Sequence, residues 1–177
     1  MSKKVLIISG SPRKGGNSET LCDRFALGAV ESGNEVEKIS LAGKEIGFCT
    51  GCYACENGEC FQKDDAPAII EKMLYSDVLV LATPVYFYSM SAQLKALIDR
   101  SVSVYPQIKE KEFYFIMVMA DTEEKNFTGT LEALRGFMLC CENSQEKGII
   151  TAAGVYEKGE IMNHPAMQKS YEAGKNV

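Results

Sequence analysis

The chain alternates short, almost wholly apolar segments with longer amphipathic ones, and this alternation limits the folds open to it. Strands that are apolar on both faces are typical of parallel sheets, which helices cover on both sides. The order strand, helix, strand therefore predicts an α/β fold with a doubly wound parallel sheet and right-handed crossovers. The predicted strands are Val5–Ser9, Val36–Leu41, Asp77–Ala82, Phe113–Ala120 and Ile149–Val155.

The segments between the strands carry apolar residues at the spacing of amphipathic helices. In a sheet of this kind, ligands bind at the carboxyl ends of the strands, where the strand order reverses. The loops after the first, third and fourth strands are therefore the first places to search for a site. The predicted helices cover residues 18–32, a segment from Asp65, residues 91–105, a segment around Leu131–Met138, and residues 165–174.

The loop after the first strand, residues 9–18, has the composition of a phosphate site. Its glycines let backbone N–H groups turn inward, and the following helix adds about half a positive charge at its N-terminus. Ser11 and Ser18 offer hydroxyls, and Arg13 offers a forked donor for phosphate oxygens. A glycine-rich turn that merely caps the helix is the alternative.

Two common nucleotide-binding loops do not fit this segment. A Walker loop needs a lysine where Gly16 stands, and Pro12 breaks a dinucleotide fingerprint. A loop with hydroxyls, backbone amides and one arginine, without an obvious magnesium ligand, suits a terminal monophosphate. FMN carries such a group.

The loop after the third strand, residues 83–91, is unusually aromatic for a connection. Pro84 stiffens its start, and Tyr86 and Phe87 can form the apolar wall that a flat heterocycle needs. The same rings could instead pack against a helix or a second subunit. Because this loop should face the phosphate loop, we favour ligand binding.

Four cysteines at C-x2-C-x2-C-x4-C spacing follow the second predicted strand, inside a cysteine-rich loop at residues 47–62. Thiolates at this spacing can hold an iron–sulfur cluster. Four-thiolate zinc usually takes two separated C-x-x-C pairs, and a redox dithiol usually opens a thioredoxin-type helix. The spacing leaves a cluster, zinc, a dithiol and plain reduced cysteines open. The four residues are Cys49, Cys52, Cys55 and Cys60.

Charge and hydropathy argue against nucleic-acid and membrane partners. The net charge is −5 and the sequence has no basic cluster, so a nucleic-acid partner is not expected. No segment reaches the length of a membrane span and the first residues lack a signal-peptide layout, which predicts a cytoplasmic protein without a membrane partner. In a reducing compartment, seven cysteines favour metal binding or redox use over disulfides.

With these loops in view, the chain resembles the flavodoxin-like NAD(P)H-dependent FMN reductase family over nearly its whole length. The resemblance is carried by GSPRKGGNS (10–18), ATPVYFYSMSAQLKALIDR (82–100) and KGIITAAGVYEKGEI (147–161). It implies one flavodoxin-like FMN-binding domain over residues 1–177, a three-layer sandwich whose five-stranded parallel sheet has the order 2-1-3-4-5. The residues predicted to bind FMN are Ser9, Ser11, Arg13, Asn17, Ser18, Thr83, Pro84, Val85, Tyr86, Phe87, Ala120 and Asp121.

The cysteine motif resembles that of the iron–sulfur flavoproteins, which implies a [4Fe–4S] cluster on Cys49, Cys52, Cys55 and Cys60. Two functions follow from the resemblance. In the first, electrons pass from NAD(P)H through bound FMN to a small-molecule acceptor such as a flavin or quinone, without a catalytic side chain. In the second, single electrons pass between a ferredoxin, the cluster and FMN. The resemblance also implies a homodimer or homotetramer.

Overall fold

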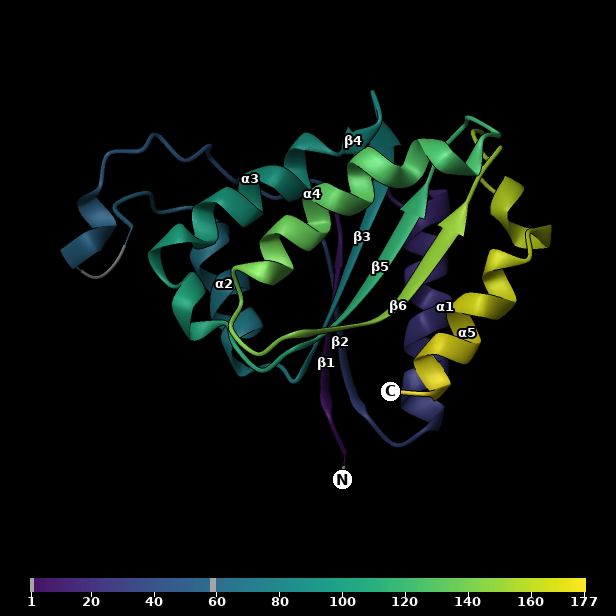
Figure 1. Ribbon diagram of the computed structural model, residues 1–177, viewed down its shortest axis with the longest axis horizontal. Coiled ribbons are helices and arrows are strands. Elements are labelled where there is room, and N and C mark those ends of the chain that lie inside the picture. The colour runs from purple at the N-terminus through teal and green to yellow at the C-terminus, as the bar shows by residue number, and fades with distance from the viewer. Residues whose placement is uncertain (1, 58–59) are drawn as a thin grey trace.

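The computed structural model describes residues 2–57 and 60–177, and a parallel sheet forms its centre (Figure 1). The strand order is β2-β1-β3-β5-β6, with a short β4 paired antiparallel to β3. Counted without β4, the parallel strands have the predicted order 2-1-3-4-5, which confirms that prediction. The strands are β1 (Lys4–Ser9), β2 (Glu35–Ser40), β3 (Val78–Tyr86), β4 (Ser89–Met90), β5 (Glu112–Val118) and β6 (Gln145–Ala152).

Helices cover both faces of the sheet, with α1 and α5 on one side and α2, α3 and α4 on the other (Figure 1). Within the described residues, no helix combines the length and apolar character that crossing a membrane needs. The α-helices are α1 (Asn17–Glu31), α2 (Ala66–Tyr75), α3 (Ala92–Arg100), α4 (Thr128–Leu139) and α5 (Ala166–Lys175). Short 3-10 turns are η1 (Ala54–Asn57), η2 (Ser101–Ser103), η3 (Tyr105–Gln107), η4 (Glu124–Phe127) and η5 (Glu160–Asn163).

Alternate residues of the inner strands pack into two apolar cores, one on each face of the sheet. In β1, Leu6 and Ile8 pack under α2, α3 and α4, whereas Val5 and Ile7 pack under α1 and α5. All four side chains are buried. Burial on both faces explains why the strand segments are almost wholly apolar.

The third strand is longer than predicted. It was expected to end at Ala82, but β3 continues to Tyr86 because its pairing with β5 runs on until Pro84 lies beside Val118. The chain then turns back into β4, so part of the predicted loop at 83–91 is a hairpin. The hairpin fixes the direction of the aromatic residues that the sequence placed in an open loop.

Two further boundaries differ from prediction. Helix α3 ends at Arg100 instead of near Tyr105. Pro106 has no N–H group and clashes with the preceding turn of a helix, so the chain continues as the 3-10 turns η2 and η3. The edge strand β6 begins at Gln145 and ends at Ala152, whereas apolarity predicted residues 149–155. An edge strand pairs through its backbone and can carry polar side chains toward solvent.

Helices α1 and α5 touch backbone to backbone through two glycines. A Cβ atom on Gly28 would overlap the carbonyl oxygen of Tyr171, and one on Gly174 would overlap that of Phe25. Neither obstacle is a flexible side chain that could move aside. The two glycines therefore determine how closely α5 packs against α1.

We predict that Gly28→Ala lowers the free energy of unfolding by about 1–3 kcal/mol, because the added methyl group forces the two helices apart. Gly136→Ala is the control, since a Cβ at that position in α4 meets no atom within 4 Å. The control should be neutral or stabilise by up to about 1 kcal/mol. Urea unfolding followed by circular dichroism measures both, and equal stability of the two variants would contradict the prediction.

Candidate functional site

A cavity of about 120 Å³ lies at the carboxyl ends of β1, β3 and β5. The ends of these strands lie side by side, because Ser9 pairs with Ala82 and Pro84 pairs with Val118, so the loops that follow them start close together. Predicted residues from three separate loops line this cavity together: Ser11, Arg13, Asn17, Ser18, Pro84, Val85, Tyr86 and Ala120.

The first turn of α1 is open to an anion. Gly16 occupies the N-cap position and has no side chain to cap the N–H groups of the first turn. Ser11 Oγ shapes the loop by accepting from Arg13 N–H and donating to Arg13 O, each at 3.1 Å. The N–H groups of a helix's first turn and the helix dipole form the kind of site that phosphate occupies.

Two cations lie beside this turn. The Arg13 guanidinium lies 5.6 Å from the centre of the Tyr156 ring, and its Nη1 donates to Tyr156 O at 3.3 Å. Lys158 Nζ donates to Lys14 O at 3.2 Å and borders the same cavity. The phosphate end of the cavity therefore carries two positive charges, of which the sequence predicted one.

Asn17 joins the phosphate loop to the loop after β6. Its Nδ2 donates to Glu157 O at 2.8 Å, and its Oδ1 accepts from Gly159 N–H at 3.0 Å. These bonds hold Tyr156 and Lys158 over the first turn of α1. Asn17 thus shapes the site with its side chain and faces the cavity at the helix start.

The other end of the cavity is apolar. Pro84 and Val85 form a wall, and Tyr86 stands half-exposed at its rim. Phe87 and Tyr88 make the two-residue hairpin turn, with φ of 50° and 59°. Turns of this type favour Asn-Gly, and bulky residues at positive φ are strained. The turn therefore presents a fully exposed Phe87 ring next to the cavity, without lining it.

Ser91 ties the two cavity loops together. Its N–H donates to Thr83 Oγ1 at 2.9 Å, and its Oγ donates to Gly10 O at 2.7 Å. The same Oγ caps α3 by accepting from Leu94 N–H. One buried serine thus connects the phosphate loop, the hairpin and the start of α3.

Four predicted residues do not line the cavity. Ser9 is buried under α1, and its Oγ has no hydrogen-bond partner among the described residues. The Thr83 hydroxyl donates to Pro84 O and accepts from the Ser91 N–H group described above. Asp121 accepts from Asn126 Nδ2 at 2.7 Å and stabilises the loop after β5. Phe87 points outward at the hairpin tip.

Sequence reasoning missed six lining residues. Tyr156 and Lys158 come from the loop after β6, whose residues resemble a family motif without indicating a ligand by themselves. The rule that parallel strands end at one edge of the sheet could have found them, because they follow a predicted strand. The six residues are Gly16, Val118, Met119, Val155, Tyr156 and Lys158.

The loop of residues 47–62 projects from the molecule beside α2 and α3 (Figure 1). Gly51 and Tyr53 bend it with positive φ of 62° and 58°. Gly58 and Glu59 belong to the predicted cysteine stretch but lie outside the described residues. The rest of the loop surrounds a second cavity of about 450 Å³, which has no lining residue in common with the first.

The second cavity brings the predicted ligands together. All seven cysteines of the chain are free thiols. In the described part of the chain, no three His, Cys, Asp or Glu side chains stand close enough to one another to hold a metal ion. The thiols share a cavity without forming a closed ligand set. Arg100 lines it beside the four cysteines, Cys49, Cys52, Cys55 and Cys60.

One of these thiols is activated by its neighbours. Hydrogen bonds from Ala54 N–H and from the Thr50 side chain lower the pKa of Cys52. A lower pKa favours the thiolate, which is the form that binds metals and attacks disulfides.

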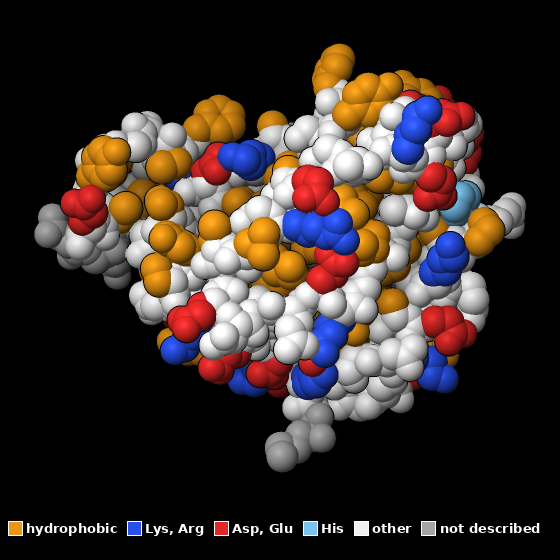
Figure 2. Space-filling view, in the orientation of Figure 1, with side chains coloured by type: hydrophobic (Ala, Val, Ile, Leu, Met, Phe, Trp, Pro, Cys, Tyr) orange, Lys and Arg blue, Asp and Glu red, His pale blue; other side chains and the backbone are white. Residues whose placement is uncertain are grey.

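The surface around this loop is rich in hydrophobic side chains. Figure 2 shows them on the cysteine-rich loop and over the face that carries α3 and α4. The homodimer or homotetramer implied by the resemblance stays a prediction. Exposed apolar residues in the loop, in α4 and in the turns after α3 are Phe48, Tyr53, Phe61, Val102, Tyr105 and Leu139.

A parallel sheet with this strand order, helices on both faces and a cavity at the carboxyl ends has the flavodoxin-like fold. The chain belongs to the NADPH-dependent FMN reductase family, which matches residues 3–135. A solved NAD(P)H:quinone oxidoreductase from Methanothermobacter marburgensis has the same fold. It is 20% identical, with a TM-score of 0.79 over 99% of this chain and 96% of that one.

Two curated relatives are named as iron–sulfur flavoproteins. One, from Methanocaldococcus jannaschii, is 53% identical over 100 residues, or 55% of this chain and 51% of that protein. Another, from Archaeoglobus fulgidus, is 38% identical over 138 residues, or 76% of this chain and 60% of that protein. The alignments thus span between about half and three-fifths of the relatives' lengths.

We predict that Ser91→Ala lowers the free energy of unfolding by about 0.5–2 kcal/mol, since it removes a helix cap and leaves Gly10 O without its donor. Ser89→Ala is a matched control, because Ser89 is an exposed residue of the same hairpin. Denaturant unfolding of the two variants decides the point. A control as destabilised as Ser91→Ala would show that the link to Gly10 contributes nothing.

Proposed function

We propose that the chain is an FMN-dependent oxidoreductase whose FMN lies in the cavity at the carboxyl ends of β1, β3 and β5. The observation that carries the proposal is that one cavity combines a helix start without a side-chain cap, flanked by Arg13 and Lys158, with the apolar wall of Pro84 and Val85. A phosphate suits the first end, and a flat heterocycle suits the second.

In this proposal the chain binds and orients the cofactor. Ser11, Arg13 and Ser18 hold the phosphate, together with N–H groups of the first turn of α1. The cavity volume, about 120 Å³, is below the roughly 300 Å³ at which pockets for whole drug-sized ligands begin. In this proposal the phosphate therefore fills the cavity, and the ring extends past its rim at Tyr86. Bound FMN supplies the redox chemistry, which ordinary side chains cannot provide.

The chemistry of the donor set fits a [4Fe–4S] cluster at the cysteine site. Four free thiols border one cavity, and thiolates are the ligands that such clusters take. The iron–sulfur flavoprotein names of the two relatives support the same assignment. Since the described thiols form no closed ligand set, the loop would have to tighten around the cluster. Single electrons would then pass between a ferredoxin-type donor, this site and the FMN cavity.

A second candidate function is the transfer of electrons from NAD(P)H to a flavin, a quinone or a similar small acceptor. The half-exposed Tyr86 and the open ring side favour it, because a nicotinamide needs access to the flavin face. In that case the cysteines could hold zinc, act as a dithiol or stay reduced. The metal content of the protein separates the two candidates.

We predict that Arg13→Ala weakens FMN binding about 10- to 100-fold, because hydrogen bonds to charged groups contribute about 1.5–3 kcal/mol each. Lys14→Ala is the control, since Lys14 carries the same charge in the same loop but does not line the cavity. Titration of FMN fluorescence gives both dissociation constants. An unchanged constant for Arg13→Ala would refute the phosphate assignment.

We predict that protein purified without oxygen contains FMN and about four irons per chain, with matching sulfide. The visible spectrum should show flavin bands over broad cluster absorbance. Flavin without iron, together with rapid NADH or NADPH oxidation, would favour the second candidate. A chain that binds no FMN even after its addition would contradict both.

A further inference from the structure

Arg100, the last residue of α3, is a charged side chain buried against the base of the cysteine-rich loop. Its side chain is 2% exposed, and its partner Asp64 is 14% exposed. Burying a guanidinium is costly unless it is paired and hydrogen bonded. The position at the helix C-terminus also favours a cation.

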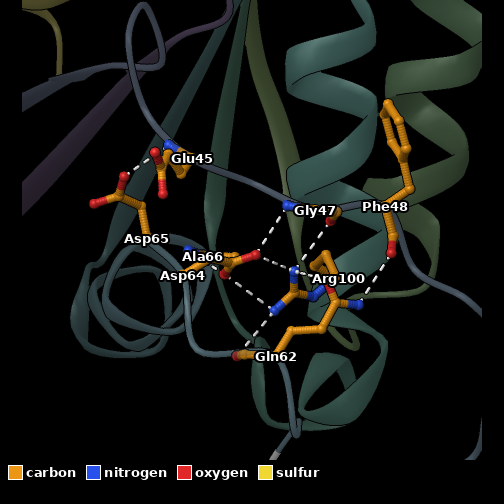
Figure 3. Close-up of polar contacts among 8 residues, drawn as sticks. All are labelled: Glu45, Gly47, Phe48, Gln62, Asp64, Asp65, Ala66 and Arg100. Carbon is orange, nitrogen blue, oxygen red and sulfur yellow. Dashed lines mark hydrogen bonds and ion pairs between the residues drawn. The ribbon is translucent and has the colours of Figure 1, made fainter.

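The guanidinium joins the two ends of the loop (Figure 3). From the first end, Gly47 O accepts from Nη1 at 3.0 Å. From the second, Gln62 Oε1 and Asp64 Oδ2 accept from Nη1 at 3.0 and 2.5 Å, and Asp64 Oδ1 accepts from Nη2 at 3.1 Å. Asp64 Oδ2 also accepts from Gly47 N–H at 2.8 Å, which closes the ring of contacts.

One donor of this buried group is left over. Arg100 Nε makes no hydrogen bond to any residue that the structure describes. A buried donor without an acceptor costs about 1–3 kcal/mol, and more when it is charged. An acceptor supplied by the loaded site would remove this cost.

Cys60 is a candidate for that acceptor, because it lines the same cavity as Arg100. Arg100 thus borders the sulfur end of the loop and also holds its base.

We propose that Arg100 is a positioning residue of the cysteine site, which closes the loop through Gly47 and Asp64 and offers its remaining N–H to sulfur at Cys60. This inference rests on the proposed cluster. Closing the loop base reduces the freedom that the four thiols lose when they gather around metal. A positive charge and a hydrogen bond beside cluster sulfur stabilise the reduced, more negative state, so they raise the reduction potential.

The test compares the whole chain with Arg100→Lys, Arg100→Met and the control Arg135→Met. Arg135 is also ion-paired, to Glu132 and Glu146, but does not line the cysteine cavity. After anaerobic reconstitution with iron and sulfide, iron per chain is measured against rising chelator, and the cluster potential is measured by redox titration. FMN per chain reports on the folding of each variant.

We expect Arg100→Met to lose iron at chelator concentrations about 10- to 100-fold lower than the wild type, with its FMN content unchanged. Arg100→Lys keeps the positive charge but loses the forked guanidinium, so its iron retention should fall between those of the wild type and Arg100→Met. If Arg100→Met does not fold, Arg100→Lys provides the test. The cluster that remains should have a lower reduction potential in Arg100→Met. A purely structural role would leave that potential unmoved.

Iron retention and potential equal to the wild type in both Arg100 variants would overturn this inference alone. A shift of the same size in Arg135→Met would also overturn it, because the effect would not be specific to the loop. A wild-type chain that takes up no iron would overturn the proposed cluster and this inference together. The iron content of the wild-type chain thus shows whether the proposed cluster or only the role of Arg100 is wrong.

Discussion

Parallel strands cannot be joined by tight turns, and this constraint organises the whole molecule. Each parallel strand is joined to the next by a long crossover, usually with a helix, that returns the chain to the other end of the sheet. The carboxyl ends of β1, β3 and β5 therefore meet at one edge, and the loops that follow them form one cavity. Asn17 and Ser91 fix the relative positions of these loops. Asn17 bonds the phosphate loop to the loop after β6, and Ser91 bonds the phosphate loop to the start of α3.

Helix α3 links the two candidate sites. At its start, Ser91 contacts the phosphate loop, and at its end, Arg100 holds the base of the cysteine-rich loop. The helix has 9 residues, so it spans about 13 Å. The cavities have no lining residue in common, and this rigid element maintains their relative position.

Much of the cavity could be predicted from local sequence. Ser11, Arg13 and Ser18 stand in a glycine-rich turn before a helix, and that pattern specifies an anion site without reference to the rest of the fold. The roles of Thr83 and Asp121 could not be read in the same way. Each has a polar side chain in a predicted site loop, but the structure uses it to hold neighbouring backbone or Asn126. Arg100 was visible only as the end of a family motif.

The residues of the chain were enough to predict the fold class and the strand order of the family, and to indicate an anion site in one loop and a thiol-rich site in another. They were enough because burial on both faces of a sheet and the start of a helix impose local, periodic patterns. That Tyr156 and Lys158 join the cavity, and that Arg100 closes the cysteine-rich loop, became clear only from the three-dimensional structure. Those contacts join residues far apart in the chain, so the pattern of neighbouring residues does not specify them.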